Sequence, residues 1–258
     1  MRLYMSYMKM HLKTALEYKT SLILTGIAQG LTMLIELYTI YALFQKFSLL
    51  SEYDVNELIV GFSSMWLGFS LAETFGRGFD TFSKLIVNGN FDMLLIRPRT
   101  LFVQIIGSDA AYEKFARIIC SLGLYIYSGI KIIGEVTWQK VLLLIEMPIG
   151  CAVIILGLFI IGATISFFTI QGLEAINIFT NGTKQVSEYP LGIYNKAIKF
   201  VFTFIIPIAI ANYYPIEYLT SRTSDWWYVV LPLLSVIPFA LSLSVFKIGL
   251  NKYTSTGS

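Results

Sequence analysis

Three glutamates interrupt stretches that are otherwise almost entirely apolar: Glu36, Glu73 and Glu146. An ionised carboxylate in apolar surroundings is costly unless it faces water, a cation or a hydrogen-bond donor. Glu36 and Glu146 can therefore line a polar substrate path and bind a cationic group. Alternatively, they reach an interface or accept hydrogen bonds from neighbouring helices. Glu73 precedes Arg77 by four residues, which is the helical spacing of an ion pair.

The sequence contains few residues suited to metal binding, nucleophilic catalysis or phosphate binding. His11 is the only histidine, and Cys120 and Cys151 are the only cysteines, so we expect neither a metal site nor a Ser-His-Asp arrangement. No Gly-x-x-x-x-Gly-Lys-Ser/Thr loop occurs, and Gly76-Arg-Gly78 is only a fragment of a glycine-rich phosphate loop. The sequence therefore predicts no catalytic residue and no cofactor bound by this chain.

The composition is that of a membrane protein. Hydrophobic residues make up 56% of the 258 residues, charged residues 14%, and the mean hydropathy is +0.69, which is too apolar for a soluble domain. Six apolar stretches, most of them near the about 20 residues that span a bilayer, run from Ser21 to Phe44, Leu58 to Phe75, Ala116 to Ile133, Val141 to Phe168, Phe200 to Tyr213 and Trp227 to Phe246. The fifth is short. We expect one all-α integral membrane domain over residues 1–258.

The basic residues predict the orientation of these spans. With the amino terminus inside, the inner segments hold fourteen Lys and Arg and the outer segments hold four, which are Lys46, Lys131, Lys140 and Arg222. An excess of cytoplasmic Lys and Arg sets membrane topology, so both termini are expected in the cytoplasm. The net charge of +3 is spread beside the spans, where anionic lipid suffices to explain it, so no nucleic-acid partner is expected.

Residues 1–20 precede the first span and have two different faces. Arg2, Lys9 and Lys13 fall on one helical stripe, and Tyr4 and His11 fall on the opposite stripe. This pattern predicts an amphipathic helix in the membrane interface, which serves either as a lever on the first span or as a simple anchor.

The cytoplasmic segment between spans two and three, residues 77–101, is called the elbow here. Phe79, Phe82 and Ile86 recur at helical spacing, so Phe79 to Val87 is expected to form a short amphipathic helix. Asn88-Gly89-Asn90 should break it, Asp92 should cap a second short turn, and Pro98 should end that turn near Arg97. A partly apolar elbow rimmed by charge suits a groove of a soluble partner, although a helix resting on the membrane surface is the alternative.

At these residues the chain resembles a known family. Gly89-Asn-Phe-Asp92-Met-Leu-Leu-Ile-Arg97-Pro98, followed by Gln104, is similar to the signature of permease subunits of type-2, export-type bacterial ABC transporters. Towards the carboxyl end, Tyr189-Pro190, Pro207 and Asn212-Tyr-Tyr-Pro215 follow the spacing of the same family.

The resemblance implies a half-transporter in the bacterial cell membrane that pairs with a second permease, a different but related chain. It implies that the elbow is a coupling helix contacting two cytosolic ATPase subunits, which bind ATP and Mg, and that reentrant helices lie on the outer side between spans five and six. The residues expected to take part in coupling are Phe79, Asp80, Phe82, Lys84, Asn88, Gly89, Asn90, Phe91, Asp92 and Arg97.

The main alternative to an ATP-driven transporter is a transporter of another class. A secondary transporter driven by an ion gradient would use Glu36 or Glu146 as its coupling site. A membrane-embedded transferase is less well supported, because no cluster of His, Cys or metal-spaced carboxylates is available to it. Co-purification of an ATPase would separate the transporter hypotheses.

Overall fold

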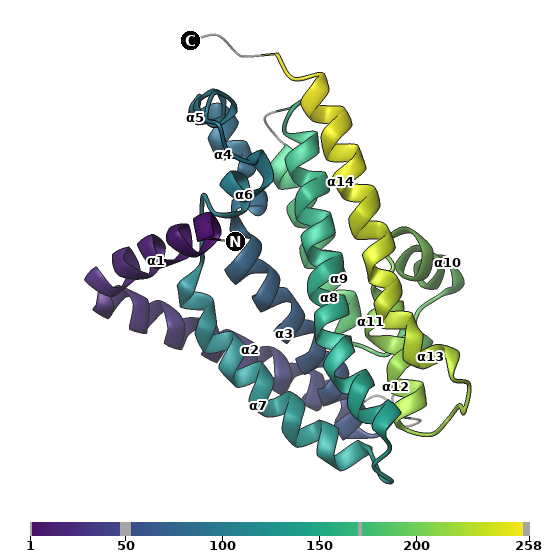
Figure 1. Cartoon of the computed structure of the whole chain (residues 1–258). Coiled ribbons are helices and arrows are strands. Elements are labelled where there is room, and N and C mark those ends of the chain that lie inside the picture. The colour runs from purple at the N-terminus through teal and green to yellow at the C-terminus, as the bar shows by residue number, and fades with distance from the viewer. Residues whose placement is uncertain (1, 47–52, 170–171, 255–258) are drawn as a thin grey trace.

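The computed structural model describes residues 2–46, 53–169 and 172–254, and in these residues it contains helices and no strands (Figure 1). The longer helices are α1 (Arg2–Glu17), α2 (Lys19–Lys46), α3 (Val55–Asp80), α7 (Phe115–Ile132), α8 (Trp138–Ile165), α9 (Gly172–Ser187) and α14 (Val236–Asn251). The shorter ones are α4 (Phe82–Val87), α5 (Asn90–Leu95), α6 (Leu101–Ile106), α10 (Lys196–Phe200), α11 (Ile208–Ala211), α12 (Tyr213–Leu219) and α13 (Trp227–Val230).

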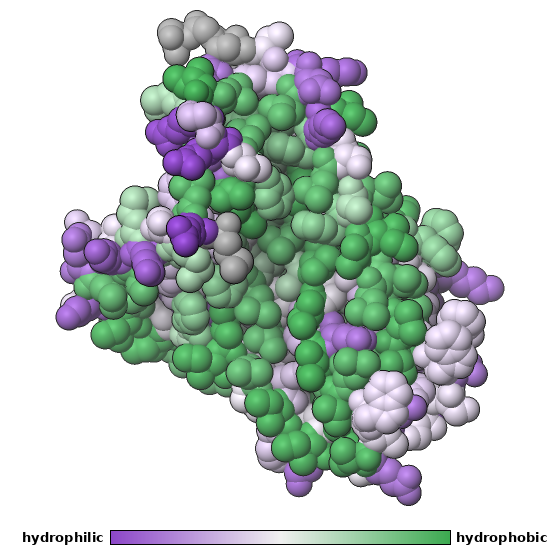
Figure 2. Space-filling model, in the orientation of Figure 1, coloured by the Kyte–Doolittle hydropathy of each residue, from purple (hydrophilic) through white to green (hydrophobic). Residues whose placement is uncertain are grey.

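Five helical segments are long and apolar enough to cross a membrane: Lys19–Lys46, Val55–Val87, Tyr112–Ile132, Trp138–Ile165 and Trp227–Asn251. They match five of the six apolar stretches expected from the sequence to within about three residues at the carboxyl ends of the third and fourth. Large apolar side chains on α2 and α14, such as Ile23, Ile27, Leu241 and Ile248, point outward. Figure 2 shows a broad hydrophobic surface over the bundle, with hydrophilic residues gathered mainly at its ends. An apolar exterior is expected of a protein whose solvent is lipid.

The expected fifth span, Phe200 to Tyr213, is not one helix. The chain instead forms two helical pieces, Lys196–Ile205 and Ile208–Leu219, which are bent by 76° relative to each other. Pro207 lies in the break, and it has no backbone N–H to continue a helix and keeps Ile206 out of helical geometry. The first piece includes a turn of π-helix, Val201–Ile205. The short fifth apolar stretch is therefore present as a bent pair of helices and not as one straight helix.

Helix α9 was not anticipated as part of the bundle. It begins near the elbow end, where Ile176 packs against Gly162 of α8, and it ends where the Ser187 carbonyl accepts a hydrogen bond of 3.2 Å from Asn212. Its 16 residues extend about 24 Å at 1.5 Å per residue. Thr180 and Thr183 are buried and donate their hydroxyl hydrogens to carbonyls one turn earlier, at 3.1 and 2.7 Å. The polar face of α9 points into the bundle. Its polar residues lower the mean hydropathy of this segment, so the sequence did not indicate a helix of the bundle here.

Helix α3 is the centre of the bundle and packs against both α7 and α8. Its side chains Phe62, Met65 and Trp66 are fully enclosed. Close approach to α8 depends on Gly68, where an added Cβ would collide with Cys151 and with the backbone around it. Small residues permit such close helix contacts in membranes, where packing replaces the hydrophobic effect as the driving force.

Helix α1 forms an angle with α2 beside the base of the elbow, away from α8 and α14 (Figure 1), and polar contacts fasten it to the rest of the chain. The Tyr4 hydroxyl donates to the Phe75 carbonyl at 3.0 Å, and the Tyr112 hydroxyl donates to the Met8 carbonyl at 2.7 Å. His11 Nε2 lies 3.0 Å from the carbonyl oxygen of Gly107. The aromatic stripe that the sequence assigned to one face therefore contacts α3 and the segment after α6.

Candidate functional site

The elbow contains two short helices, α4 and α5, and α6 begins at its last residue. Helix α3 continues through Phe79 and Asp80, the chain turns at Thr81, and α4 begins at Phe82. The expected helix from Phe79 to Val87 was therefore wrong at its start. The predicted break is present, because α4 ends at Val87 and Gly89 adopts a left-handed conformation with φ of 67°. Glycine reaches that region without steric cost.

The second helix of the elbow, α5, ends at Leu95, close to the predicted end near Arg97. Its N-cap is Gly89, so Asp92 does not cap it as expected. Instead, the Asp92 carboxylate accepts a hydrogen bond of 3.1 Å from the Tyr253 hydroxyl, beyond the end of α14. Burial, followed by the nearby Asp92 carboxylate, raises the pKa of Tyr253, so this phenol remains a donor.

An aromatic cluster forms the interior of the elbow. Phe79, Phe82 and Phe91 are almost fully buried, and they contact rings of α6, of the segment after α8 and of α14. The Phe82 centroid lies 5.0 Å from that of Phe91 and 5.2 Å from that of Phe167, both close to edge-to-face. Edge-to-face pairs are favourable beyond their buried area. These three predicted coupling residues therefore lie in the interior of the elbow and not on its surface.

Two further contacts fix the base of the elbow. Gly78 packs directly on α6, where an added Cβ would collide with the Ile105 carbonyl oxygen and with Ser108. The buried Gln104 amide donates to the Leu94 carbonyl at 3.2 Å and to the Arg99 carbonyl at 3.1 Å. Gln104 thus satisfies the Leu94 carbonyl, which the end of α5 leaves without a helical partner, and a carbonyl of the loop that follows.

The outward face of the elbow is both apolar and polar. Val87, Met93, Leu95 and Ile96 are exposed, and Ile96 is 83% exposed. Around them Asn88, Asn90 and Arg97 are exposed, while Gly89 and Asp92 are partly exposed. The four exposed apolar residues of this face were not singled out from the sequence. They alternate with Phe91 and Leu94, which are buried, and this pattern could have indicated that they lie on the surface. We call this surface, residues 87–97 without Phe91 and Leu94, the docking face.

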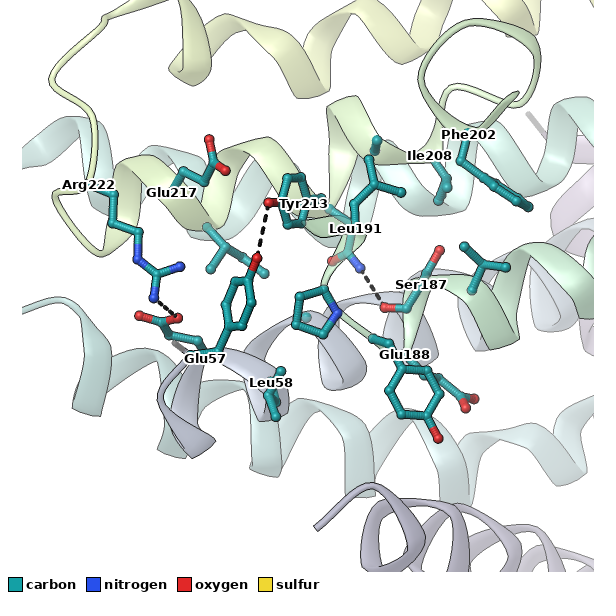
Figure 3. A pocket seen from close by; sticks show the side chains of 18 residues that line it. Glu57, Leu58, Ser187, Glu188, Leu191, Phe202, Ile208, Tyr213, Glu217 and Arg222 are labelled. Carbon is teal, nitrogen blue, oxygen red and sulfur yellow. Dashed lines mark hydrogen bonds and ion pairs between the residues drawn. The ribbon is translucent and has the colours of Figure 1, made fainter. Parts of the chain in front are cut away.

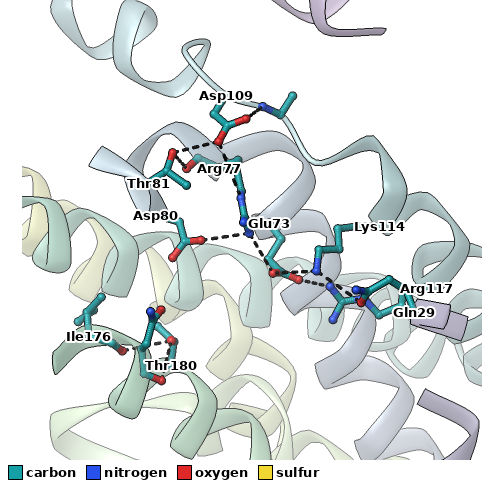
Figure 4. A network of polar contacts seen from close by, with 12 residues as sticks. Gln29, Glu73, Arg77, Asp80, Thr81, Asp109, Lys114, Arg117, Ile176 and Thr180 are labelled. Atoms are coloured by element: carbon teal, nitrogen blue, oxygen red, sulfur yellow. Dashed lines mark hydrogen bonds and ion pairs between the residues drawn. The ribbon is translucent and has the colours of Figure 1, made fainter. Parts of the chain in front are cut away.

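Below the elbow lies a network of buried and partly buried charges (Figure 4). The Glu73 carboxylate is paired with Arg77 at 3.3 Å, as the spacing predicted, and also with Lys114 at 3.5 Å and with Arg117. Arg77 continues the network to Asp80 at 3.2 Å and to Asp109 at 4.0 Å. Asp80 is thus tied to Arg77 at the end of α3, whereas Lys84 is exposed on α4.

The two carboxylates assigned to a substrate path lie in different surroundings. Glu36 of α2 forms an ion pair of 3.3 Å with Lys184 of α9, whose ammonium lies 4.1 Å from the centre of the Trp66 ring. Glu146 lies on α8, and its Oε2 is buried without a hydrogen-bond partner in the described structure. No contact brings Glu36 and Glu146 together in the residues that the structure describes.

At the opposite end of the bundle, a small enclosed pocket brings together residues of the second family-like region (Figure 3). Tyr189, Pro190, Asn212 and Tyr213 line it together with Tyr53. The Tyr53 and Tyr213 hydroxyls lie 3.4 Å apart, and Arg222 pairs with Glu57 at 2.7 Å nearby. Its free volume of about 40 Å³ admits one or two waters, so this region is a packed junction.

Comparison with known proteins gives one result. A family model described as ABC-2 family transporter protein matches residues 31–257, and no match was found among curated proteins or among solved structures. No group of three His, Cys, Asp or Glu side chains that could hold a metal ion occurs in the described part of the chain. The resemblance to permease subunits of type-2 ABC transporters is confirmed by the family match. Because that match covers most of the sequence, the chain belongs to the ABC-2 family of transporter proteins and is a multi-pass membrane protein.

Proposed function

We propose that this chain is the membrane-spanning half of an ATP-driven exporter and that the docking face of the elbow binds a cytosolic ATPase. The observation that carries this proposal is the construction of the elbow. Its apolar tip, including Met93 and Ile96, is exposed beyond the bundle, while its interior is locked by buried aromatic rings. An exposed apolar patch rimmed by polar residues is typical of a protein interaction site.

The elbow is connected to three long helices, so its displacement would move all of them. It continues α3 with only one interruption at Thr81. Phe82 contacts Phe167, which follows α8, and Phe246 of α14. Closure of bound ATPase subunits would therefore be transmitted to the bundle as a shift of packed helices. ATP and Mg would be held by the partner, since the sequence has no phosphate-binding loop of its own.

The topology that we propose has six crossings, formed by α2, α3, α7, α8, α9 and α14. Both described chain ends lie at the elbow end, because Tyr4 bonds to Phe75 and Tyr253 bonds to Asp92. The bent segment from α10 to α12 follows α9 at the other end and is assigned as the outer reentrant element.

This assignment changes the charge count. Lys184 lies within α9, and Lys196 and Lys199 follow it, so these three leave the inner segments. Of the fourteen basic residues counted as inner, eleven remain. Lys196 and Lys199 join the outer segments, which then hold six, so the elbow end keeps the excess of Lys and Arg and is still assigned to the cytoplasm. We further propose a bacterial plasma membrane location, two ATPase copies and a second, related permease.

The alternative, an ion-driven carrier, is less well supported by the contacts. A coupling carboxylate must exchange an ion during transport, whereas Glu36 is already neutralised by Lys184. The Oε2 atom of Glu146 has no hydrogen-bond partner in the described structure. Of the two glutamates, Glu146 is therefore the one that fits an ion-driven carrier.

The experiment is purification of the intact complex from its native membrane, with mass spectrometry of its subunits and transport assays in inverted vesicles. The exporter proposal expects a co-purifying ATPase with a phosphate-binding loop and uptake that requires ATP. Uptake that follows an imposed proton or sodium gradient without ATP, together with the absence of an ATPase, would support the carrier instead.

A further inference from the structure

A polar cavity of about 330 Å³ lies between α3, α7 and α9 at the base of the elbow. Five basic side chains line it, against two acidic ones, Glu73 and Asp80. The basic residues are Arg77, Lys84, Lys114, Arg117 and Lys184. A cavity with this balance of charge attracts anions and repels cations.

The surplus of positive charge is carried by Lys84, Lys114 and Arg117. Arg77 is balanced by Asp80 and Asp109, and Lys184 is balanced by Glu36. Lys114 and Arg117 share the single carboxylate of Glu73, which also pairs with Arg77. Lys84 is exposed and forms no ion pair within the described residues.

Arg117 provides an independent indication of a ligand. The residue is only 4% exposed, and its Nε–H has no hydrogen-bond acceptor in the described structure. Leaving a buried charged donor without an acceptor costs more than leaving a neutral one. An oxygen atom of a bound anion would supply the missing acceptor, and guanidinium groups match the geometry of phosphate and carboxylate oxygens.

We propose that this cavity is a binding site for an oxyanion, a phosphate or carboxylate group, held by Lys84, Lys114 and Arg117. The group belongs either to the headgroup of an anionic amphiphile or to a free anion, and the experiment below distinguishes these sources. Since the site adjoins the start of α4, the inference deepens the proposed export function by naming the chemistry of a ligand at the cytosolic mouth. Binding is measured on the chain alone, so its failure is distinguishable from a failure of ATPase docking.

The structure supplies a fluorescent probe for this site. Trp66 packs against two residues that line the cavity, with the Arg117 guanidinium 5.1 Å and the Lys184 ammonium 4.1 Å from its ring centre. The other three tryptophans, Trp138, Trp226 and Trp227, are exposed and can be replaced by phenylalanine. The resulting full-length chain would be placed in nanodiscs of neutral phosphatidylcholine and titrated with inorganic phosphate, or prepared with increasing phosphatidylglycerol.

A saturable change of Trp66 fluorescence with either probe supports the proposal. Saturation by phosphatidylglycerol alone identifies a headgroup as the source, and saturation by inorganic phosphate identifies a free anion. Lys84→Gln should weaken binding about two- to fivefold, as expected for one exposed charge pair. Arg117→Gln should weaken it about tenfold or more, because it removes charged hydrogen bonds in a buried position.

Two further variants separate binding from general effects on folding. Glu73→Gln should tighten binding, because it removes the carboxylate that competes for Lys114 and Arg117. Lys131→Gln, a basic residue at the far end of α7, should leave binding unchanged. If Arg117→Gln does not fold, the opposite effects of Lys84→Gln and Glu73→Gln still decide the question. Absence of saturable binding to both probes, or equal affinity in the Lys84 and Glu73 variants, would overturn the proposal.

Discussion

A substitution at Ile96 can distinguish an effect on ATPase docking from an effect on the folding of the elbow. The residue is 83% exposed on the docking face, so Ile96→Ala should leave the folded chain almost unchanged, within about 0.5 kcal/mol. If an ATPase covers the residue, the substitution removes about 2 kcal/mol of apolar burial from the interface and weakens binding roughly thirtyfold. Phe82 is fully buried, and Phe82→Ala should instead destabilise the fold by about 3–5 kcal/mol.

The assay combines two measurements on the same preparations. Thermal unfolding in detergent reports the fold, and titration with the purified ATPase in nanodiscs reports docking. Ile130→Ala is the matched control, because Ile130 is the same residue type, is 70% exposed and lies on α7 away from the elbow. The reasoning is refuted if Ile96→Ala and Ile130→Ala bind the ATPase with equal affinity, or if Ile96→Ala unfolds as readily as Phe82→Ala.

Three further predictions test the packing, the buried ion pair and the topology. Gly78→Ala should destabilise the chain by about 1–3 kcal/mol, because its methyl group would collide with the Ile105 carbonyl; unchanged thermal unfolding would contradict this. Glu36→Gln and Lys184→Gln should each lower stability, and a double-mutant cycle should give a coupling energy of about 0.5–3 kcal/mol, whereas strict additivity would show that the pair is not formed. In a chain lacking Cys120 and Cys151, an impermeant thiol reagent on intact cells should label Glu135→Cys in the loop before α8 and not Asn88→Cys; the reverse pattern would invert the proposed topology.

The sequence predicted those features that depend on nearby residues. Long apolar runs predicted five helices that are long and apolar enough to cross a membrane. Asn88-Gly89-Asn90 predicted the turn between α4 and α5, where the left-handed backbone conformation at position 89 favours glycine. The pairing of Glu73 with Arg77 followed from helical spacing. Each of these is a local pattern with a direct physical cause.

Features that depend on distant contacts could not be predicted in this way. The burial of Phe82 and Phe91 requires Phe167 and Phe246, which follow much later in the chain. Arg117 meets Glu73 only because α7 packs beside α3. Helix α9 was missed because polar side chains such as Thr180 and Thr183 are buried against its neighbours, so the mean hydropathy along this segment is too low to indicate a helix of the bundle.

The most direct test of ATPase docking is site-specific photo-crosslinking in intact cells. A photoreactive amino acid would replace Met93, which is exposed on the docking face, or Ile130, which is exposed on α7. The proposed function predicts that position 93 forms an adduct with an ATPase that carries a phosphate-binding loop, and that position 130 does not. Failure to form this adduct at position 93 in a transport-active complex, or equal yields at both positions, would contradict it.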